Sequence, residues 1–553
     1  MLDMAFGDRK GSDGHPRCGE SGRVSQVGAS DAEPDTGVTL AELLAAFSLA
    51  TDLGLGQPME HVLRSWRIAS RLGERVELDE AARSALFYVA VLAWVGCVAD
   101  TPEVARMFGD DIAFRSDSYD VELSGLQGMT FMIRHAGAGG AAMHRLRLAT
   151  TLVATGGKRV EQGLMSHCLT TSRMADLLGL GPDVSIPLQQ FFTRWDGRGL
   201  PRGVSHEDIA QTVRLFHLSD IVEVYHRTGG VQAAIKVARA RSGTHFDPRL
   251  VDEFCAGAED LLAARPDDPD CHEQIAAEPA LQARLTGHEL DAALDVIADF
   301  TDLRSTWRAG HSRAVAELAA QAAECAGLPD SEVTAVRRAG LLHDVGLHGV
   351  PSSILDKPGP LTFTESERLR MHAYYTERVL ARPAGLAKFG RIAALTHERL
   401  DGSGYHRGLA GPSIPVSARI LAAADAYRAM TEARPHRPAL TPKQAATELR
   451  GAVRRGQLDA QASDSVLTAA GQHPGRRRVS GPAGLTPREI QVLSLIAAGA
   501  STRQVAHALA ITEKTAGTHI ERIYAKTGAS TRSTATLFAL QHGLLDQPTP
   551  LRS

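Results

Sequence analysis

The hydrophobic pattern of this chain is helical along most of its length. Alanine and leucine recur at spacings of three and four residues, as in LAELLAAFSLATDL (residues 40–53) and HSRAVAELAAQAAECAGL (residues 311–328), whereas alternating β-branched runs are scarce. The pattern predicts an all-α protein. Two stretches interrupt it, RPDDPD (residues 265–270) and HPGRRRVSGPAG (residues 473–484), and their Pro, Gly and charged residues are typical of linkers.

The region before the first of these stretches and the region after it look like copies of each other. The string WDGRGLPRG (residues 195–203) parallels LDGSGYHRG (residues 400–408) at an offset of 205. Three polar pairs keep this offset: Asp196 with Asp401, His167 with His372, and Asp220 with Asp425. Upstream, His61 aligns with His311 at an offset of 250. The two offsets differ because the first copy carries one insertion, roughly at residues 104–150.

The second copy contains a set of side chains with metal-ligating chemistry. In chain order these are His311, His343, Asp344, His372, His397 and Asp425. Four imidazoles and two carboxylates suit Fe, Mn, Zn or Ni ions. The adjacent His343 and Asp344 project about 100° apart on a helix, so both can serve one centre only if the aspartate reaches between two metals. The set predicts a binuclear site, which would act on a phosphate ester.

These residues lie in motifs that resemble HD-GYP domains of the HD phosphohydrolase superfamily, which hydrolyse cyclic di-GMP and related cyclic dinucleotides. The resemblance runs from about residue 309 to 438 and rests on HSRAV, HDVG, GVPSSILDKPGPLT, MHAYY, HERLDGSGY and ILAAADAYRAMT. It implies two divalent transition-metal ions held by the six residues named above. It also implies catalytic roles for His343, Asp344, Glu398 and Asp401, and a substrate-binding loop with Gly402, Gly404 and Tyr405.

The chain departs from the family pattern at three positions near this site. The family writes HDIGK where this chain has HDVGL, so Leu347 replaces a phosphate-binding lysine, and Thr396 stands where the family has the first histidine of HHE. Trp307 occupies the position of a glutamate that serves a third metal, so we expect no third metal. Loss of the lysine removes about 1.5–3 kcal/mol of charge-assisted hydrogen bonding, or about 10- to 100-fold in rate. His348 is a candidate replacement.

The first copy has lost part of the same pattern. Ala93 and Trp94 occupy the HD positions and Phe192 the position of the later histidine, whereas His61, His167 and Asp220 remain. We therefore predict a degenerate HD-GYP-like domain without metal that serves packing, dimerisation or sensing. Its WDGRGLPRG string is interpreted as a turn, in which Gly supplies positive φ and Asp an Asx-type cap.

The final part of the chain predicts four short helices. LTPRE, the STRQVA helix, ITEKTAGTHIERIYAKTG and a terminal HGL resemble the LuxR-type helix-turn-helix DNA-binding domain. Between residues 485 and 545 six Lys or Arg oppose three Glu, as a phosphate backbone requires. The resemblance implies a third helix in the major groove, with DNA contacts from Arg503, Lys514, Thr515, Thr518, His519, Arg522 and Lys526. The expected core is Val492, Leu495, Ile496, Val505, Ala506, Leu509, Ile511, Ile520, Ile523 and Tyr524.

Length and composition agree with a cytoplasmic protein of several domains. A chain of 553 residues exceeds one hydrophobic core, its net charge is only −4, and its six cysteines form no CxxC pair. We recognise neither a signal peptide nor an apolar run of about 18 residues, so no membrane partner is expected. The expected segments are a disordered tail (1–36), the degenerate domain (37–264), a linker (265–290), the HD-GYP domain (291–472), a linker (473–483) and the LuxR-type module (484–548).

The sequence thus predicts tandem HD-type helical domains followed by a LuxR-type helix-turn-helix module. The expected function is that of a transcriptional regulator that binds double-stranded DNA as a homodimer. Its two-metal domain would hydrolyse a cyclic dinucleotide such as cyclic di-GMP. The alternative is a catalytically weak or inactive HD-GYP domain that senses a nucleotide or dimerises; Leu347 favours this alternative, and the six retained ligands favour the hydrolase.

Overall fold

The computed structural model describes residues 37–123, 125–155, 158–263, 270–472, 482–529, 531–542 and 544. The expected disordered tail (1–36) and residues 473–481 of the second expected linker lie outside this part of the chain. The chain divides into two compact units, residues 1–472 and residues 473–553. Within the described residues the secondary structure is helical, with only isolated β-bridges in place of strands. The predicted all-α class is confirmed.

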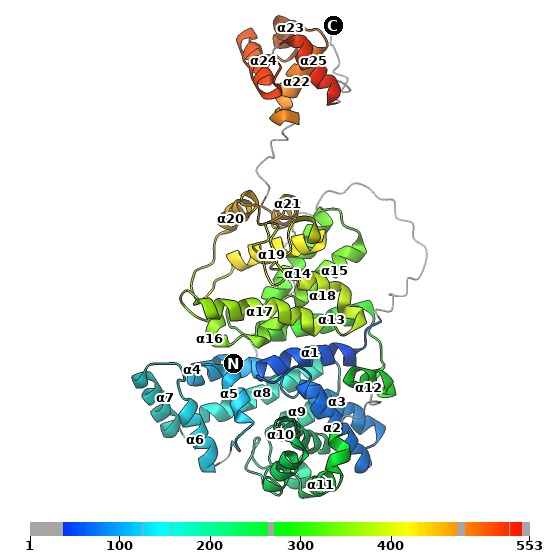
Figure 1. Ribbon diagram of the computed structural model, residues 1–553, viewed down its shortest axis with the longest axis vertical. Helices are drawn as coiled ribbons and strands as arrows, with labels where there is room; N and C mark the ends of the chain where they lie inside the picture. Colours follow the sequence, from blue (N-terminus) through cyan, green and yellow to red (C-terminus); the bar gives the residue numbers. More distant parts are fainter. Residues whose placement is uncertain are drawn as a thin grey trace. The chain divides into compact units, whose positions relative to one another are not determined.

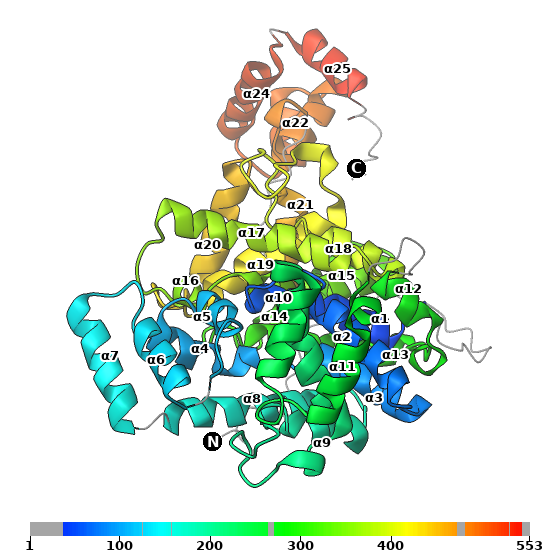
Figure 2. The same cartoon turned by 60° about the horizontal axis from the view of Figure 1, so that its bottom comes forward.

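The first unit contains both copies, and Figure 1 shows their helices in two neighbouring groups, blue to green and green to orange. The first copy comprises α1 (Leu40–Gly54), α2 (His61–Arg75), α3 (Glu80–Leu92), α4 (Cys97–Phe108), α5 (Asp111–Ser118), α6 (Gly125–His135), α7 (Ala142–Thr155), α8 (Lys158–Leu177), α9 (Pro182–Gln189), η1 (His206–Asp208), α10 (Gln211–Ala240) and α11 (Pro248–Leu262). Helices α5, α6 and α7, which the insertion supplies, lie together at one side of this copy (Figure 2).

The second copy follows in the same unit. It comprises α12 (Cys271–Ala277), η2 (Pro279–Leu281), α13 (Gly287–Asp302), α14 (His311–Cys325), α15 (Asp330–Leu342), η3 (Val345–Gly349), α16 (Ser352–Leu355), α17 (Phe363–Leu380), η4 (Ala384–Leu386), α18 (Ala387–Ala393), η5 (Gly411–Ser413), α19 (Val416–Thr431), α20 (Pro442–Arg454) and α21 (Ala460–Ala469). Several of these helices begin at a capping box, in which a side chain and a backbone amide satisfy each other. Thr286 with Glu289 opens α13, and Thr362 with Glu365 opens α17.

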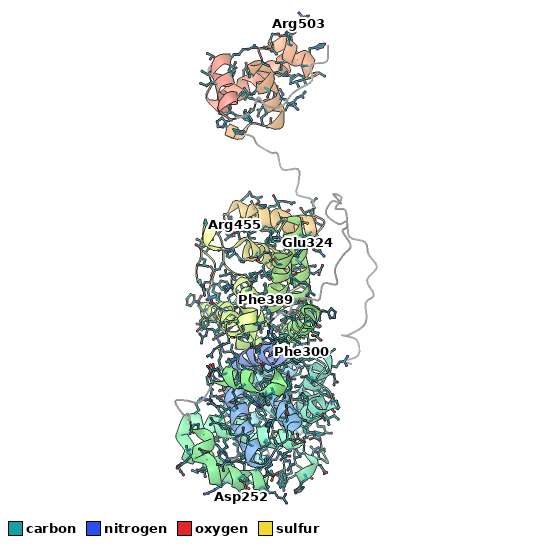
Figure 3. The ribbon with its side chains drawn as sticks, turned by 90° about the vertical axis from the view of Figure 1, so that its right-hand side faces the viewer. Asp252, Phe300, Glu324, Phe389, Arg455 and Arg503 are labelled. Atoms are coloured by element: carbon teal, nitrogen blue, oxygen red, sulfur yellow. The ribbon has the colours of Figure 1, made fainter. Side chains whose placement is uncertain are left out.

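One hydrophobic core runs through both copies. Buried side chains from Val38 to Leu467 form a single contiguous cluster. Helix α1 contributes to it on several sides, because it packs against α2 and α3 of its own copy and against η3, α17 and α13 of the other. Phe300 of α13, labelled in Figure 3, is also part of this core. Residues 270–290, expected to be a linker, carry α12 and η2 and bury Cys271, Ile275 and Leu281.

A buried ionic cluster also joins the copies. Asp111 of α5 accepts hydrogen bonds from Arg304 (3.1 Å), Arg115 (3.0 Å) and the backbone amide of Ser352 (2.8 Å). Arg304 is 1% exposed and also donates to the carbonyl of Val350 at 2.6 Å. Arg115 continues the cluster to Asp100 at 2.6 Å. Through these bonds the insertion of the first copy is attached to the second copy, including the segment that follows its HDVG motif.

One stretch, Glu80–Phe108, is long and apolar enough to cross a membrane by length and composition alone. The expectation that no such run exists was wrong. In the fold this stretch forms α3 and α4, and 67% of its most apolar window is buried inside the protein. Its apolar side chains, among them Leu86, Phe87 and Val91, belong to the shared core.

The second unit is a small helical module with its own core. It contains η6 (Pro482–Gly484), α22 (Pro487–Ala497), α23 (Thr502–Ala508), α24 (Glu513–Thr527) and α25 (Arg532–Gln541). Capping boxes open α22 (Thr486 with Glu489) and α23 (Ser501 with Gln504). The residues predicted as its core are all in the apolar cluster or packed against it, so that prediction is confirmed.

Candidate metal centre and DNA-binding helix

The fold brings the six expected metal ligands of the second copy to one place. His311 begins α14, where Gly310 takes the left-handed conformation (φ 77°) just before it. His343 caps the end of α15 and Asp344 follows directly, before η3. His372 lies on α17 and Asp425 on α19, whereas His397 stands in the turn after α18. Helices that are distant in sequence thus converge on the HD pair.

Asp344 lies between two groups of histidines. Its Oδ2 is 3.2 Å from His343 Nε2 and 3.8 Å from His311 Nε2, whereas its Oδ1 is 3.8 Å from His372 Nε2. Potential ligand atoms lie within 4.8 Å of one another in each of two sets, His311 with His343 and Asp344, and Asp344 with His372 and His397. The two carboxylate oxygens therefore face two neighbouring centres, as the adjacent HD pair requires.

Asp425 completes the arrangement from α19. Its Oδ1 is 3.3 Å from His311 Nε2 and 3.7 Å from His343 Nε2, and its Oδ2 is 4.0 Å from His397 Nδ1. Burial acts to raise the pKa of Asp425, but the neighbouring His311 and His343 hold that pKa well below its ordinary value. The carboxylate is therefore negative at neutral pH, as a metal ligand must be.

The ligand cluster contains buried polar atoms that are free to bind metal ions. Within the described residues, four buried nitrogens here have no hydrogen-bond partner: Nε2 of His311, His343, His372 and His397. Buried polar atoms are normally hydrogen-bonded, because an unsatisfied one costs about 1–3 kcal/mol. A cluster of such atoms whose lone pairs converge has the donor set that borderline divalent metals accept. The residues present therefore fit a metal centre.

The histidines are oriented by bonds to their other ring nitrogen. Nδ1 of His343 donates to the carbonyl of Gly340 at 2.7 Å, and Nδ1 of His372 donates to the carbonyl of Leu369 at 2.5 Å. His311 instead binds the Glu432 carboxylate through Nδ1 at 2.8 Å. Such partners leave Nε2 free as the ligand atom. The sequence did not reveal this role of Glu432, because the residue lies outside the motifs that carry the resemblance.

Burial also sets the protonation of the second group of histidines. It lowers the pKa of His372 to about 4 and the pKa of His397 well below its ordinary value. Both rings are therefore neutral at pH 7, the form that binds metal. Tyr405 covers His397 with a parallel ring at a centroid distance of 5.0 Å. The expected substrate-side tyrosine thus lies directly beside the ligand cluster.

Part of the ligand cluster lines a cleft of about 750 Å³. The lining includes Asp344, His372, His397, Tyr405 and Asp425, and also four cations, Arg308, Lys357, Arg434 and Arg437. The guanidinium of Arg308 contacts Asp344 Oδ2 directly. Burial lowers the pKa of Arg308 to about 10, so it remains charged at neutral pH. The sequence analysis missed Arg308, because one arginine in the loop between α13 and α14 is no signal by itself.

Leu347 and His348, the third and fourth residues after Asp344, concern the lysine that the family pattern has and this chain lacks. Leu347 is buried with Val350 and Ile354 in a small apolar cluster and also lines the cleft. His348 does not replace the missing lysine, because it is buried against Phe47 of α1 with a ring-centroid distance of 5.3 Å. Burial lowers the pKa of His348 to about 3, so it carries no charge at neutral pH. Arg308, Lys357, Arg434 and Arg437 are the cations that line the cleft instead.

Two residues expected to be catalytic have other partners. Both oxygens of Glu398 accept backbone amides, from Arg407 and Leu409, each at 2.8 Å. Asp401 is exposed and accepts from the amide of Ser403 at 3.0 Å, which closes an Asx-type turn. Neither lines the cleft. These hydrogen bonds shape the loop, and the catalytic roles of the two residues stay a prediction.

The glycines of this loop also have a structural role. A Cβ at Gly404 would lie 2.4 Å from the amide nitrogen of Arg399 and 2.5 Å from Cα of Glu398, so only glycine permits this approach. Gly402 takes a positive φ of 77° in the turn. Together they place Tyr405 at the wall of the cleft, and of the three expected substrate-loop residues only Tyr405 lines it.

In the first copy, His61 and Asp220, the counterparts of His311 and Asp425, are engaged by other protein side chains. His61 Nδ1 binds Glu223 at 2.6 Å, and its Nε2 lies 3.1 Å from Asp220 and 3.3 Å from the Tyr119 hydroxyl. The indole of Trp94 donates to Asp220 at 3.3 Å. Both ring nitrogens of His61 are therefore engaged. Tyr119, which the insertion supplies, was not among the expected partners.

The helix-turn-helix of the second unit presents a polar face on α24. Lys514, Thr515, Thr518 and Arg522 are exposed there, His519 is half-buried, and their spacing of three and four residues places them on one side of the helix. Arg503 of α23 is also exposed (Figure 3). Lys526 differs from the others, because its ammonium binds the buried Glu489 carboxylate of α22 at 2.7 Å. This lysine therefore joins two helices of the module.

Comparisons with known proteins agree with both sites. The family described as "HD domain" matches residues 295–462, and "Bacterial regulatory proteins, luxR family" matches residues 483–539. The 3'3'-cGAMP-specific phosphodiesterase 3 of Vibrio cholerae serotype O1 is 29% identical over 413 residues, which cover 72% of this chain and 88% of that protein. A cyclic di-GMP phosphodiesterase of Thermotoga maritima is 40% identical over 146 residues, 26% of this chain and 39% of that protein.

A solved structure supports the fold of the first unit. The crystal structure of a cyclic GMP-AMP specific phosphodiesterase of V. cholerae (V-cGAP3) superposes with a TM-score of 0.55 and 24% identity, covering 79% of this chain and 98% of that one. This similarity concerns the fold. The two family matches show that the chain contains an HD domain and, after it, a domain of the luxR family of bacterial regulatory proteins, as the sequence predicted.

Proposed function

We propose that this protein is a transcriptional regulator whose second copy is a metal-dependent phosphodiesterase for a cyclic dinucleotide. The observation that carries the proposal is the set of buried, unpartnered ligand atoms around the two oxygens of Asp344. The relatives named above are phosphodiesterases of 3'3'-cGAMP and cyclic di-GMP. The LuxR-type module supplies DNA binding.

The metal cofactor in this proposal is a pair of divalent transition-metal ions, Fe, Mn, Zn or Ni. His311, His343 and Asp425 would hold one ion, His372 and His397 the other, and Asp344 both. Bound there, such ions supply Lewis-acid chemistry toward a phosphodiester. The chain itself contributes neutral imidazoles and ionised carboxylates, and Glu432 and the carbonyls of Gly340 and Leu369 orient the rings.

The charge of the cleft favours an anionic substrate. Arg308, Lys357, Arg434 and Arg437 all line it, so a molecule with two phosphodiesters meets cations on more than one wall. Tyr405 adds an aromatic surface beside His397, against which a base can stack. A volume of about 750 Å³ is in the range of pockets for molecules of nucleotide size. These features support a cyclic dinucleotide over a small phosphate monoester.

A second candidate function is nucleotide sensing without hydrolysis. Leu347 stands where the family has a lysine, and the guanidinium of Arg308 contacts the carboxylate that both metals would share. An arginine in this position competes with metal for Asp344. In this version the cleft binds the dinucleotide, and occupancy alone changes DNA binding.

The regulatory output rests on the second unit. Lys514, Thr515, Thr518, His519, Arg522 and Arg503 are the residues that we propose to contact double-stranded DNA, with α24 in the major groove. Two half-sites require two copies of the module, so we infer a homodimer. We place the protein in the cytoplasm, where its DNA target lies, and the five cysteines in the described part of the chain are free thiols.

The test combines metal content with turnover. Elemental analysis of the purified protein and hydrolysis assays with cyclic di-GMP and 3'3'-cGAMP should show about two metals per chain and a linear dinucleotide product. Asp344→Ala should lose both metals and all turnover. His343→Ala should lose turnover and at least one of the two metals. His288→Ala, an exposed histidine of the same copy, is the matched control and should change neither quantity.

Other outcomes separate the two candidate functions. Metal and dinucleotide binding without turnover would support the sensor. Turnover that survives Asp344→Ala would refute the assignment of this site. Absence of metal in protein that was purified under anaerobic conditions with added Fe, Mn, Zn or Ni would refute the metal centre itself.

A further inference from the structure

The first copy contains a pocket at the position that corresponds to the metal cleft of the second. It has a volume of about 110 Å³, and Trp94, His167 and Phe192 line it. At the offsets of the repeat these residues align with Asp344, His372 and His397 of the metal site. Replacement of an aspartate by Trp94 and of a histidine by Phe192 has therefore changed a polar, metal-binding place into an aromatic one.

The rest of the lining extends this apolar character. Phe108 and Phe114 stack with a centroid distance of 4.0 Å and an interplanar angle of 7°, and Tyr119 completes an aromatic wall from the insertion. Apolar cavities of this size hold water poorly and accept a single aromatic ring, as an engineered cavity of about 150 Å³ accepts benzene. The pocket is thus suited to a flat molecule of one ring.

One polar atom in the pocket has no partner among the described residues. His167 is fully buried, and its Nε2 donates to the carbonyl of Ala93 at 2.7 Å. This bond fixes the tautomer, so Nδ1 carries a lone pair, and burial lowers the pKa of the ring to about 4. Nδ1 makes no hydrogen bond, and the nearest carboxylate oxygen, of Asp100, is 3.9 Å away. A hydrogen-bond donor is what this atom lacks.

We propose that this pocket binds a small, neutral aromatic molecule with one hydrogen-bond donor, such as a phenol, whose donor meets His167 Nδ1. An acidic ligand is disfavoured, because Asp100 and Glu103 are in the lining and the one cation, Arg115, is already paired with Asp100 and Asp111. The degenerate copy then has a ligand site of its own, chemically different from the dinucleotide cleft.

The experiment measures binding of two probes of equal shape by the full chain. Phenol and toluene differ by a hydroxyl in place of a methyl group, and calorimetry should give about tenfold tighter binding of phenol. His167→Phe keeps a ring but removes the acceptor, so it should abolish this preference and keep toluene binding. Gly163→Leu should block both probes, since Gly163 lines the pocket and a Cβ there meets only Asp100 Cβ, at 3.8 Å.

Gly163→Ala is the matched control and should keep the tenfold preference, because one methyl group leaves most of the pocket open. Equal affinity for phenol and toluene in the wild type would overturn the proposal, as would failure of both to bind at millimolar concentration. Unchanged phenol binding in Gly163→Leu would place the probe elsewhere and also overturn it. If His167→Phe does not fold, the Gly163 pair decides. None of these readouts depends on metal or on dinucleotide hydrolysis.

Discussion

Asp111 is the carboxylate on which the contact between the two copies depends, and its removal gives the sharpest stability prediction. Asp111→Ala deletes the acceptor for Arg304, Arg115 and the amide of Ser352. Arg115 keeps Asp100, but Arg304, 1% exposed, keeps only neutral oxygens, from Thr101 and Val350. Removal of one partner from a buried ion pair costs about 3–5 kcal/mol. That is a large fraction of a typical folding stability of about 5–15 kcal/mol.

The assay is urea unfolding of the full chain, followed by circular dichroism at constant pH. The copies share one core, so we expect the loss to appear as a shift in the midpoint of a common transition. Asp111→Asn keeps the shape and an acceptor, so it should cost less than Asp111→Ala. The double variant Asp111→Leu/Arg304→Met removes both charges and should recover most of the loss.

Two results would refute this reasoning. One is a cost below about 1 kcal/mol for Asp111→Ala, which is the range of an exposed ion pair. The other is additivity, in which the double variant loses the sum of the two single changes. Residues in one ionic network should instead show a coupling energy of about 0.5–3 kcal/mol.

Three further predictions concern the other sites. Glu432→Gln should weaken metal binding about 10- to 100-fold, measured by chelator competition, because it loosens the orientation of His311; unchanged affinity would remove Glu432 from the site. Burial alone would lower the pKa of His61, but Asp220 and Glu223 raise it to about 10. The stability that His61 contributes is therefore complete below pH 6.5 and declines as the pH rises toward 10, by at most about 1.4 kcal/mol per pH unit. His61→Gln should flatten this part of the plot of the urea midpoint against pH. Parallel plots for the wild type and the variant would contradict the prediction. Arg522→Ala should weaken DNA binding and reduce the slope of log K against log salt by about 0.9 if it contacts one phosphate; an unchanged slope in titrations between low and moderate salt would exclude that contact.

The ligand set and the helical class could be predicted from the sequence because both depend on local patterns. The six ligands stand in short motifs: His311 and His343 mark helix ends, His372 and Asp425 lie on helices, and Asp344 and His397 follow helix ends. The repeat also located the altered positions Trp94 and Phe192. Such signals are visible in a few residues of sequence, whatever the distant partners are.

The partners that the sequence did not reveal are all contacts across long separations. Glu432, Arg308 and the Asp111–Arg304 pair have no motif, and their roles appear only when distant helices are brought together. The sequence also did not reveal that the Glu398 carboxylate of HERLDGSGY accepts two backbone amides of its own loop. The stretch after RPDDPD was read from composition as a linker, but three apolar side chains suffice to fix it to the core.

Helix α1 has a further consequence during synthesis of the protein. It leaves the ribosome before the rest of the first copy, and its partners η3 and α17 are translated only after that whole copy. At about 5–20 residues per second the delay is on the order of tens of seconds. During that time Phe47 and its apolar neighbours lack part of their cover, so the nascent first copy offers chaperones a hydrophobic surface that the finished protein conceals.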